Sequence, residues 1–181
     1  MPQEGSPFSI SSDVCIREQL YLGQELSREA FLHLKEVQEM HLCRQQALVY
    51  LARREHTAFE LNSKLQRKGF SSHSIENTLA LLEEENLLSE LRYALQFIES
   101  RQRKNPEGRA LMSHRLSQKG VARDAAKRAL DELYTEELII DYVGRAYSLA
   151  LKKGDQEKAR MLLAKKGFSS YEIRLGLERL S

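Results

Sequence analysis

The chain has 181 residues, of which 41% are hydrophobic and 30% charged, and its formal net charge is +2. No apolar stretch approaches the roughly 18 residues that a membrane-spanning helix needs, and no Lys or Arg precedes Arg17, so the sequence predicts neither a membrane protein nor a secretory signal. The two cysteines, Cys15 and Cys43, are therefore expected to be reduced thiols in a cytoplasmic protein.

Residues 1–43 lie outside the repeats described below. Residues 1–7 are expected to form a loose tail, and residues 8–22 one or two short strands or irregular turns. Ser27 is a suitable N-cap for one helix that runs to about Met40. The sequence therefore predicts a short non-repeated N-terminal segment.

One short phrase then occurs three times. Its copies are Leu65 to Ser71, Leu116 to Ala122 and Leu163 to Ser169, and their glycines are 51 and 47 residues apart. A glycine after a helical run supplies the left-handed residue that ends many helices, and an apolar pair on either side of it closes the turn. A Lys stands before each glycine, where it opposes the negative end of the helix dipole. Each copy therefore predicts the end of one helix and the start of the next.

Apolar residues recur at helical spacing after each phrase, a capping residue such as Thr57 precedes it, and a further apolar run lies upstream. Each repeat is therefore predicted to hold three short helices, within residues 44–88, 89–138 and 139–181. A fixed period of about 50 residues is typical of stacked repeat proteins. The predicted fold is all-α, an elongated and curved stack of three tandem three-helix repeats.

Positive charge gathers in the second half of the chain. Residues 1–98 carry 10 basic and 14 acidic side chains, whereas residues 99–181 carry 18 basic and 12 acidic ones. Basic clusters near helix ends suit a polyanion such as DNA. Such clusters are also typical of solvated helix surfaces, and their position supports both interpretations.

No enzyme motif accompanies these charges. The sequence has no phosphate-binding glycine loop with a Lys, no dinucleotide fingerprint and no pair of closely spaced cysteines. His33, His41 and Cys43 match no standard zinc spacing. The sequence therefore predicts a protein that is not an enzyme and that needs neither a cofactor nor a metal.

The stretch from Ala47 to Phe70 resembles the first repeat of the RecX family, the bacterial regulators of the recombinase RecA. It contains Leu51-Ala52-Arg53-Arg54-Glu55-His56-Thr57 and ends in Lys68-Gly69-Phe70. The segment Leu87 to Arg101 resembles the family's second repeat, and the later Lys-Gly turns continue the pattern over about residues 20–181. The second copy departs from the family pattern, because Val121-Ala122 replaces Phe-Ser.

The resemblance implies a monomeric, mainly negative regulator that binds the RecA–DNA filament. It would limit filament extension, strand exchange, ATP hydrolysis and co-protease activity, and contact single- or double-stranded DNA weakly. A helix-turn-helix DNA-binding regulator and a helical-repeat scaffold for another protein remain alternatives. The expected contacts with the filament or DNA are basic side chains from all three repeats. They are Arg53, Arg54, Lys64, Arg67 and Lys68, then Arg101, Arg103, Lys104, Arg115, Lys119, Lys127 and Arg128, then Lys165 and Lys166.

Overall fold

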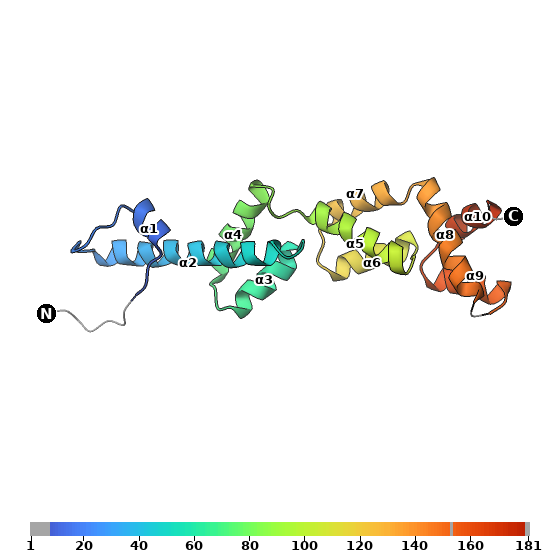
Figure 1. The fold of residues 1–181 in the computed structure, drawn as a ribbon, viewed down its shortest axis with the longest axis horizontal. Helices are drawn as coiled ribbons and strands as arrows, with labels where there is room; N and C mark the ends of the chain where they lie inside the picture. The colour runs from blue at the N-terminus through green and yellow to red at the C-terminus, as the bar shows by residue number, and fades with distance from the viewer. Residues whose placement is uncertain (1–7, 153, 180–181) are drawn as a thin grey trace. The chain divides into compact units, whose positions relative to one another are not determined.

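The chain is all-helical in the computed structural model, which describes residues 8–152 and 154–179 (Figure 1). No strand occurs in these ranges, which confirms the predicted fold class. The predicted loose tail of residues 1–7 lies outside the described residues. The helices are α1 Ser12–Arg17, α2 Arg28–Leu51, α3 Ala58–Arg67, α4 Ser72–Glu84, α5 Glu90–Lys104, α6 Arg109–Gln118, α7 Arg123–Leu133, α8 Glu136–Leu151, α9 Gln156–Lys165 and α10 Ser170–Glu178.

The chain divides into two compact units. Residues 1–54 and 61–87 form the first unit, and residues 55–60 and 88–181 form the second. The first turn of α3 is thus counted with the second unit, and the rest of that helix with the first.

The N-terminal segment differs from its prediction in two ways. Residues 8–22 contain the short helix α1, where short strands or irregular turns were expected. Ser11 ties this helix to α2 by donating both its backbone N–H and its hydroxyl to Gln38 Oε1, at 2.9 and 3.1 Å. The helix that begins after Ser27 does not end near Met40 but continues to Leu51. No glycine or proline interrupts this stretch, so nothing in the backbone stops the helix there.

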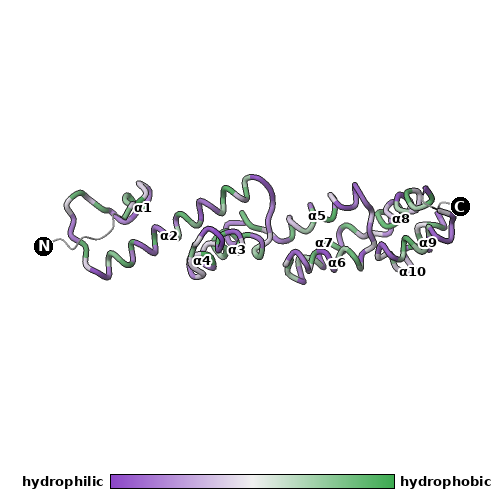
Figure 2. The backbone as a smooth tube through the Cα atoms, turned by 90° about the horizontal axis from the view of Figure 1, so that it is seen from below, coloured by the Kyte–Doolittle hydropathy of each residue, from purple (hydrophilic) through white to green (hydrophobic). Residues whose placement is uncertain are grey.

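Helix α2 is the long element of the first unit. Figure 2 shows apolar and polar residues alternating along it, and its buried positions are Leu34, Gln38, Cys43 and Ala47. Leu34 and Gln38 share one face because they are four residues apart, and so do Cys43 and Ala47, but the interval of five between Gln38 and Cys43 turns the second pair to the other side of the helix. Helix α2 packs against α4 and also contacts α1. The predicted repeat boundary between residues 43 and 44 falls inside this continuous helix.

All three predicted helix stops are confirmed. Gly69, Gly120 and Gly167 have φ angles of 90°, 72° and 82°. In each copy the residue after the glycine donates its backbone N–H to the carbonyl five residues earlier: Phe70 to Leu65 at 3.4 Å, Val121 to Leu116 at 3.1 Å and Phe168 to Leu163 at 3.2 Å. The glycine itself donates to the carbonyl three residues earlier, at 2.9 Å each time. This pair of bonds is the Schellman motif, and it satisfies carbonyls that the helix end leaves open.

The helix after each turn is capped in the first and third copies and not in the second. Ser71 accepts a hydrogen bond from the third residue of its helix, and Ser169 forms a full capping box with Glu172. Ala122 begins α7 with a similar extended backbone but has no side-chain acceptor. The second copy therefore lacks the stabilisation that the N-cap side chain gives to the other two.

The second unit holds the larger core. Helix α5 packs on α7, and α8 packs on α9 and α10. Its buried side chains include those from the apolar stripes predicted after the second turn, Ala126 and Leu130, and the turn residue Phe168. None of the helices in residues 8–152 and 154–179 combines the length and apolar character that crossing a bilayer requires.

Two joints connect helix starts to Lys-Gly turns within the second unit. In the first joint, the Thr57 hydroxyl at the start of α3 donates to the carbonyl of Lys119, at 3.0 Å. In the second joint, the backbone N–H of Gly108 at the start of α6 donates to the carbonyl of Lys166, at 2.9 Å. The second and third copies of the repeated turn therefore both end a helix and contact the start of a helix from earlier in the chain.

Candidate nucleic-acid interface

Three of the predicted contact residues meet beside one tyrosine in the first unit. Lys64, Arg67 and Lys68 from the end of α3 line a shallow pocket of about 210 Å³ with Tyr50 from α2. The Lys64 Nζ lies 4.6 Å from the centroid of the Tyr50 ring. We call these four residues the Tyr50 patch. An aromatic ring beside several cations is the combination that binds single-stranded nucleic acid, because the ring stacks on bases and the cations attract phosphates.

The predicted residues Arg53 and Arg54 follow α2 in the same unit, and both side chains are exposed. Both carry positive charge, but they do not line the pocket of the Tyr50 patch.

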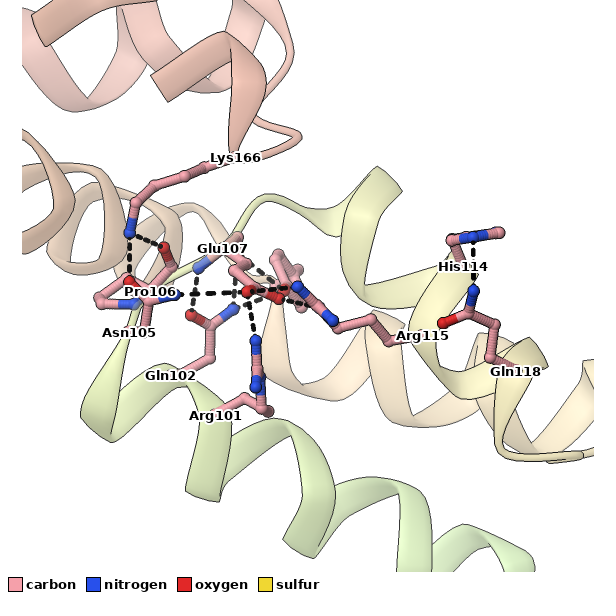
Figure 3. Close-up of polar contacts among 10 residues, drawn as sticks. Arg101, Gln102, Asn105, Pro106, Glu107, His114, Arg115, Gln118 and Lys166 are labelled. Carbon is pink, nitrogen blue, oxygen red and sulfur yellow. Dashed lines mark hydrogen bonds and ion pairs between the residues drawn. The ribbon is translucent and has the colours of Figure 1, made fainter. Parts of the chain in front are cut away.

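In the second unit, two predicted contact residues bind a buried carboxylate. Arg101 Nη2 lies 2.5 Å from Glu107 Oε1, and Arg115 Nε lies 2.5 Å from Glu107 Oε2 (Figure 3). The Glu107 side chain is 2% exposed, whereas the two arginine side chains remain 36% and 34% exposed. Because a buried carboxylate needs compensating charge, the first task of both arginines is structural.

A buried hydrogen-bond network fixes Glu107 in place. Its backbone N–H donates to Gln102 Oε1 at 2.9 Å, and its carbonyl accepts from Gln102 Nε2 at 2.7 Å and from the Tyr134 hydroxyl at 3.0 Å. Burial raises the pKa of the Tyr134 phenol far above its ordinary value, so this hydroxyl stays protonated and donates. The loop before α6 is therefore held rigidly, and the two arginines with it.

The second joint brings further cations to this loop. Lys166 Nζ donates to Asn105 Oδ1 at 2.5 Å and to the carbonyl of Pro106 at 3.2 Å (Figure 3). Arg103 and Lys104 directly precede Asn105, Lys165 directly precedes Lys166, and all three of these cations are exposed. We define the joint patch as Arg101, Arg103, Lys104, Arg115, Lys165 and Lys166.

The joint patch carries six cations, and two of them, Arg101 and Arg115, pair with Glu107. It draws these side chains from α5, α6 and α9, which are distant in sequence. A rigid surface with excess positive charge binds a phosphate backbone and gives that binding its salt dependence.

The other predicted contact residues are more scattered. Lys119 Nζ lies 3.7 Å from Glu60 Oε1, which offsets part of its charge. Lys127 and Arg128 are exposed on α7, and Lys127 lines a groove of about 860 Å³.

Two arginines of this groove are not among the predicted contact residues. Arg109 and Arg123 also line it, and each is the first residue of its helix. Cations are unfavourable at that end of the helix dipole. That unusual placement is the signal in the sequence that could have marked them as residues with another task.

Among the residues that the structure describes, no three or more His, Cys, Asp or Glu side chains form a group that could hold a metal ion.

Comparison with known proteins gives a consistent family. The family model described as "RecX, first three-helix domain" matches residues 43–82, and the one described as "RecX, second three-helix domain" matches residues 89–130. The chain is 40% identical over 143 residues to "Regulatory protein RecX" of Prosthecochloris aestuarii, covering 74% of this chain and 90% of the relative. It is 33% identical over 145 residues to the protein of the same name from Chlorobium phaeobacteroides, with the same two coverages.

Solved structures share the fold. A crystal structure of regulatory protein RecX superposes with a TM-score of 0.82 at 19% identity, covering 98% of this chain and 92% of that one. The crystal structure of RecX from Lactobacillus salivarius gives a TM-score of 0.69 at 22% identity, covering 78% and 96%. The relatives are named as regulatory proteins and not as enzymes.

Proposed function

The chain belongs to the RecX family of regulatory proteins, and we propose that it regulates the bacterial recombinase RecA by binding the RecA–DNA filament. Its effect is mainly negative: it limits filament extension, strand exchange, ATP hydrolysis and co-protease activity. The observation that carries the proposal is 40% identity to a protein named "Regulatory protein RecX" over 90% of that relative's length. The chain acts as a monomer, without a cofactor, in the cytoplasm where RecA and DNA are found.

The two basic patches supply the contacts with DNA in this proposal. In the joint patch, Arg103, Lys104 and Lys165 are exposed and meet phosphates, whereas Arg101 and Arg115 first neutralise Glu107. The Tyr50 patch adds a ring for stacking on an unpaired base. Each patch alone binds weakly, and simultaneous contact with several sites on one filament raises the overall affinity.

A titration of the protein into a RecA ATPase assay on single-stranded DNA tests the proposal. We expect inhibition by the wild type and weaker inhibition by the triple variant R103E/K104E/K165E. The matched control is R160E/R174E/R179E, which changes the same charge at exposed positions outside both patches. Since each phosphate contact on a single strand contributes about 0.7 to the slope of log affinity against log salt, the patch variant should lose up to about 2 in the slope measured for single-stranded DNA.

Inhibition by a folded patch variant with an unchanged salt slope would refute the assignment of the joint patch. Sequence-specific duplex binding without RecA would instead favour a helix-turn-helix regulator. No effect on RecA and no affinity for DNA would favour a scaffold for another protein.

A further inference from the structure

The groove beside α7 is separate from both basic patches. It is enclosed by α6 and α7, by Ile139 of α8 and by the first residues of α10, and its volume is about 860 Å³. Aliphatic side chains that are more than nine-tenths buried form its floor: Val121, Ala126, Leu130 and Ile139. Ser113 and Ser117 from α6 line one wall. A groove of this size with an apolar floor can accept several side chains of a ligand.

The charge available at the rim of this groove is positive. Arg123 and Lys127 are exposed and lie four residues apart, on one face of α7. The carboxylate of Glu172 also lines the groove but is 5% exposed, and its two oxygens accept from the backbone N–H groups of Ser169 and Arg109. The Glu172 carboxylate is therefore occupied by backbone donors, whereas Arg123 and Lys127 are exposed and can contact a ligand.

A third cation that lines the groove, Arg109, is bound by other groups of the protein. Arg109 donates to the carbonyl of Leu130 at 2.8 Å and forms an ion pair with Asp131. It braces α6 against α7, so the two walls keep their separation. Tyr171 at the opposite rim likewise donates its hydroxyl to Glu136, at 2.9 Å.

We propose that this groove binds an acidic peptide segment of a partner protein. An aliphatic side chain of the segment enters between α6 and α7 and covers the floor at Ala126 and Leu130, while neighbouring carboxylates pair with Arg123 and Lys127. The aliphatic floor favours a peptide over a nucleic acid, because stacking of bases requires aromatic or guanidinium planes. The inference rests on the proposed function for one point, that the partner carrying the segment is the recombinase.

Fluorescence anisotropy with a dye-labelled peptide, Gly-Asp-Glu-Leu-Ile-Glu-Asp-Gly, tests the groove in the full chain. We expect saturable binding, at least about tenfold weaker for a peptide with Lys in place of each acid and for one with Ser in place of Leu and Ile. The double variant R123E/K127E should weaken binding by about tenfold or more. Ser117→Trp should do the same by filling the groove without changing its charge. Arg128→Glu, on the same helix but not lining the groove, should stay within about twofold of the wild type.

Equal binding of the acidic and basic peptides, or binding that Ser117→Trp leaves unchanged, would overturn the proposal. The proposal would also be overturned if oligo-dT displaced the peptide and R123E/K127E lost oligo-dT binding. The groove would then be a nucleic-acid site. Circular dichroism of each variant shows that its fold is retained. Inhibition of RecA without peptide binding refutes the groove alone, whereas peptide binding without any effect on RecA supports the groove and refutes the proposed function.

Discussion

Alanine in place of each turn glycine should destabilise the chain by different amounts at the three copies. Gly69, Gly120 and Gly167 all have φ between 72° and 90°, so alanine introduces left-handed strain of about 1–2 kcal/mol at each. What differs is the space around the new methyl group. At Gly69 no described atom beyond the two neighbouring residues lies within 4 Å of an added Cβ, so strain is the whole effect.

The other two glycines lie in the joints, where a methyl group has no room. A Cβ at Gly120 would lie 2.6 Å from the Cβ of Phe59, and one at Gly167 would lie 2.4 Å from the Cβ of Leu111 and 2.8 Å from its backbone nitrogen. Backbone and Cβ atoms cannot rotate away, so overpacking adds about 1–3 kcal/mol. We expect a loss of about 1–2 kcal/mol for Gly69→Ala and about 2–5 kcal/mol for Gly120→Ala and Gly167→Ala.

Urea unfolding followed by circular dichroism at 222 nm measures these losses, with each transition fitted separately if the two units unfold apart. A double-mutant cycle identifies the cause: in a Phe59→Gly background, the loss caused by Gly120→Ala should shrink by about 1 kcal/mol or more. Equal losses at all three glycines, or a cycle with no coupling, would refute the reasoning that the second and third turns are filled by an earlier helix start.

Ala122→Ser should stabilise α7 by about 0.5–1 kcal/mol, because it supplies the missing N-cap acceptor; an unchanged urea midpoint would contradict this. Glu107→Gln should lower the free energy of unfolding by about 1–3 kcal/mol, because the partly exposed arginines lose charge-assisted hydrogen bonds. It should nevertheless raise affinity for oligo-dT in an anisotropy titration, because its two arginine partners lose their counter-charge; lower DNA affinity in the folded variant would count against the joint patch. Burial raises the pKa of the Cys43 thiol, so less of it is thiolate at pH 8 and DTNB should label it about tenfold more slowly than the half-buried Cys15. The Cys43 rate should keep rising above the pH at which an ordinary thiol is fully ionised, and equally fast labelling of both cysteines at pH 8 would contradict its burial.

The helix stops and starts could be predicted because they depend on a few adjacent residues. A Lys-Gly pair between two apolar residues determines its own backbone bonds, and all three copies formed the expected turn. The segment before Ser27 carried weaker signals. Ser11 precedes helix α1 there, and its side chain does not cap the helix. Instead Ser11 donates hydrogen bonds to Gln38, 27 residues away. No local sequence pattern indicates a hydrogen-bond partner so far along the chain.

The candidate site was predicted less completely than the fold, for the same physical reason. Sequence clusters identified Arg101 and Arg103 alike, but the structure pairs Arg101 with the buried Glu107 and leaves Arg103 exposed. The two positions differ by their angle around α5 and by a carboxylate on a loop that packs against it. Whether a cation serves the fold or meets a ligand therefore depends on tertiary contacts that its neighbours in sequence do not specify.

The joint patch exists because the second joint forms. Lys166 belongs to the third copy of the repeated phrase, and Arg103 and Lys104 belong to the end of α5; the bonds from Gly108 to the Lys166 carbonyl and from Lys166 to Asn105 and Pro106 bring them together. Disrupting this joint should therefore separate cations as well as reduce stability. In Gly167→Ala, affinity for oligo-dT should fall at a temperature where the chain is still helical, whereas Gly69→Ala should leave the joint patch intact. A Gly167→Ala protein that is helical and binds DNA with the wild-type salt slope would show that these cations act separately and not as one surface.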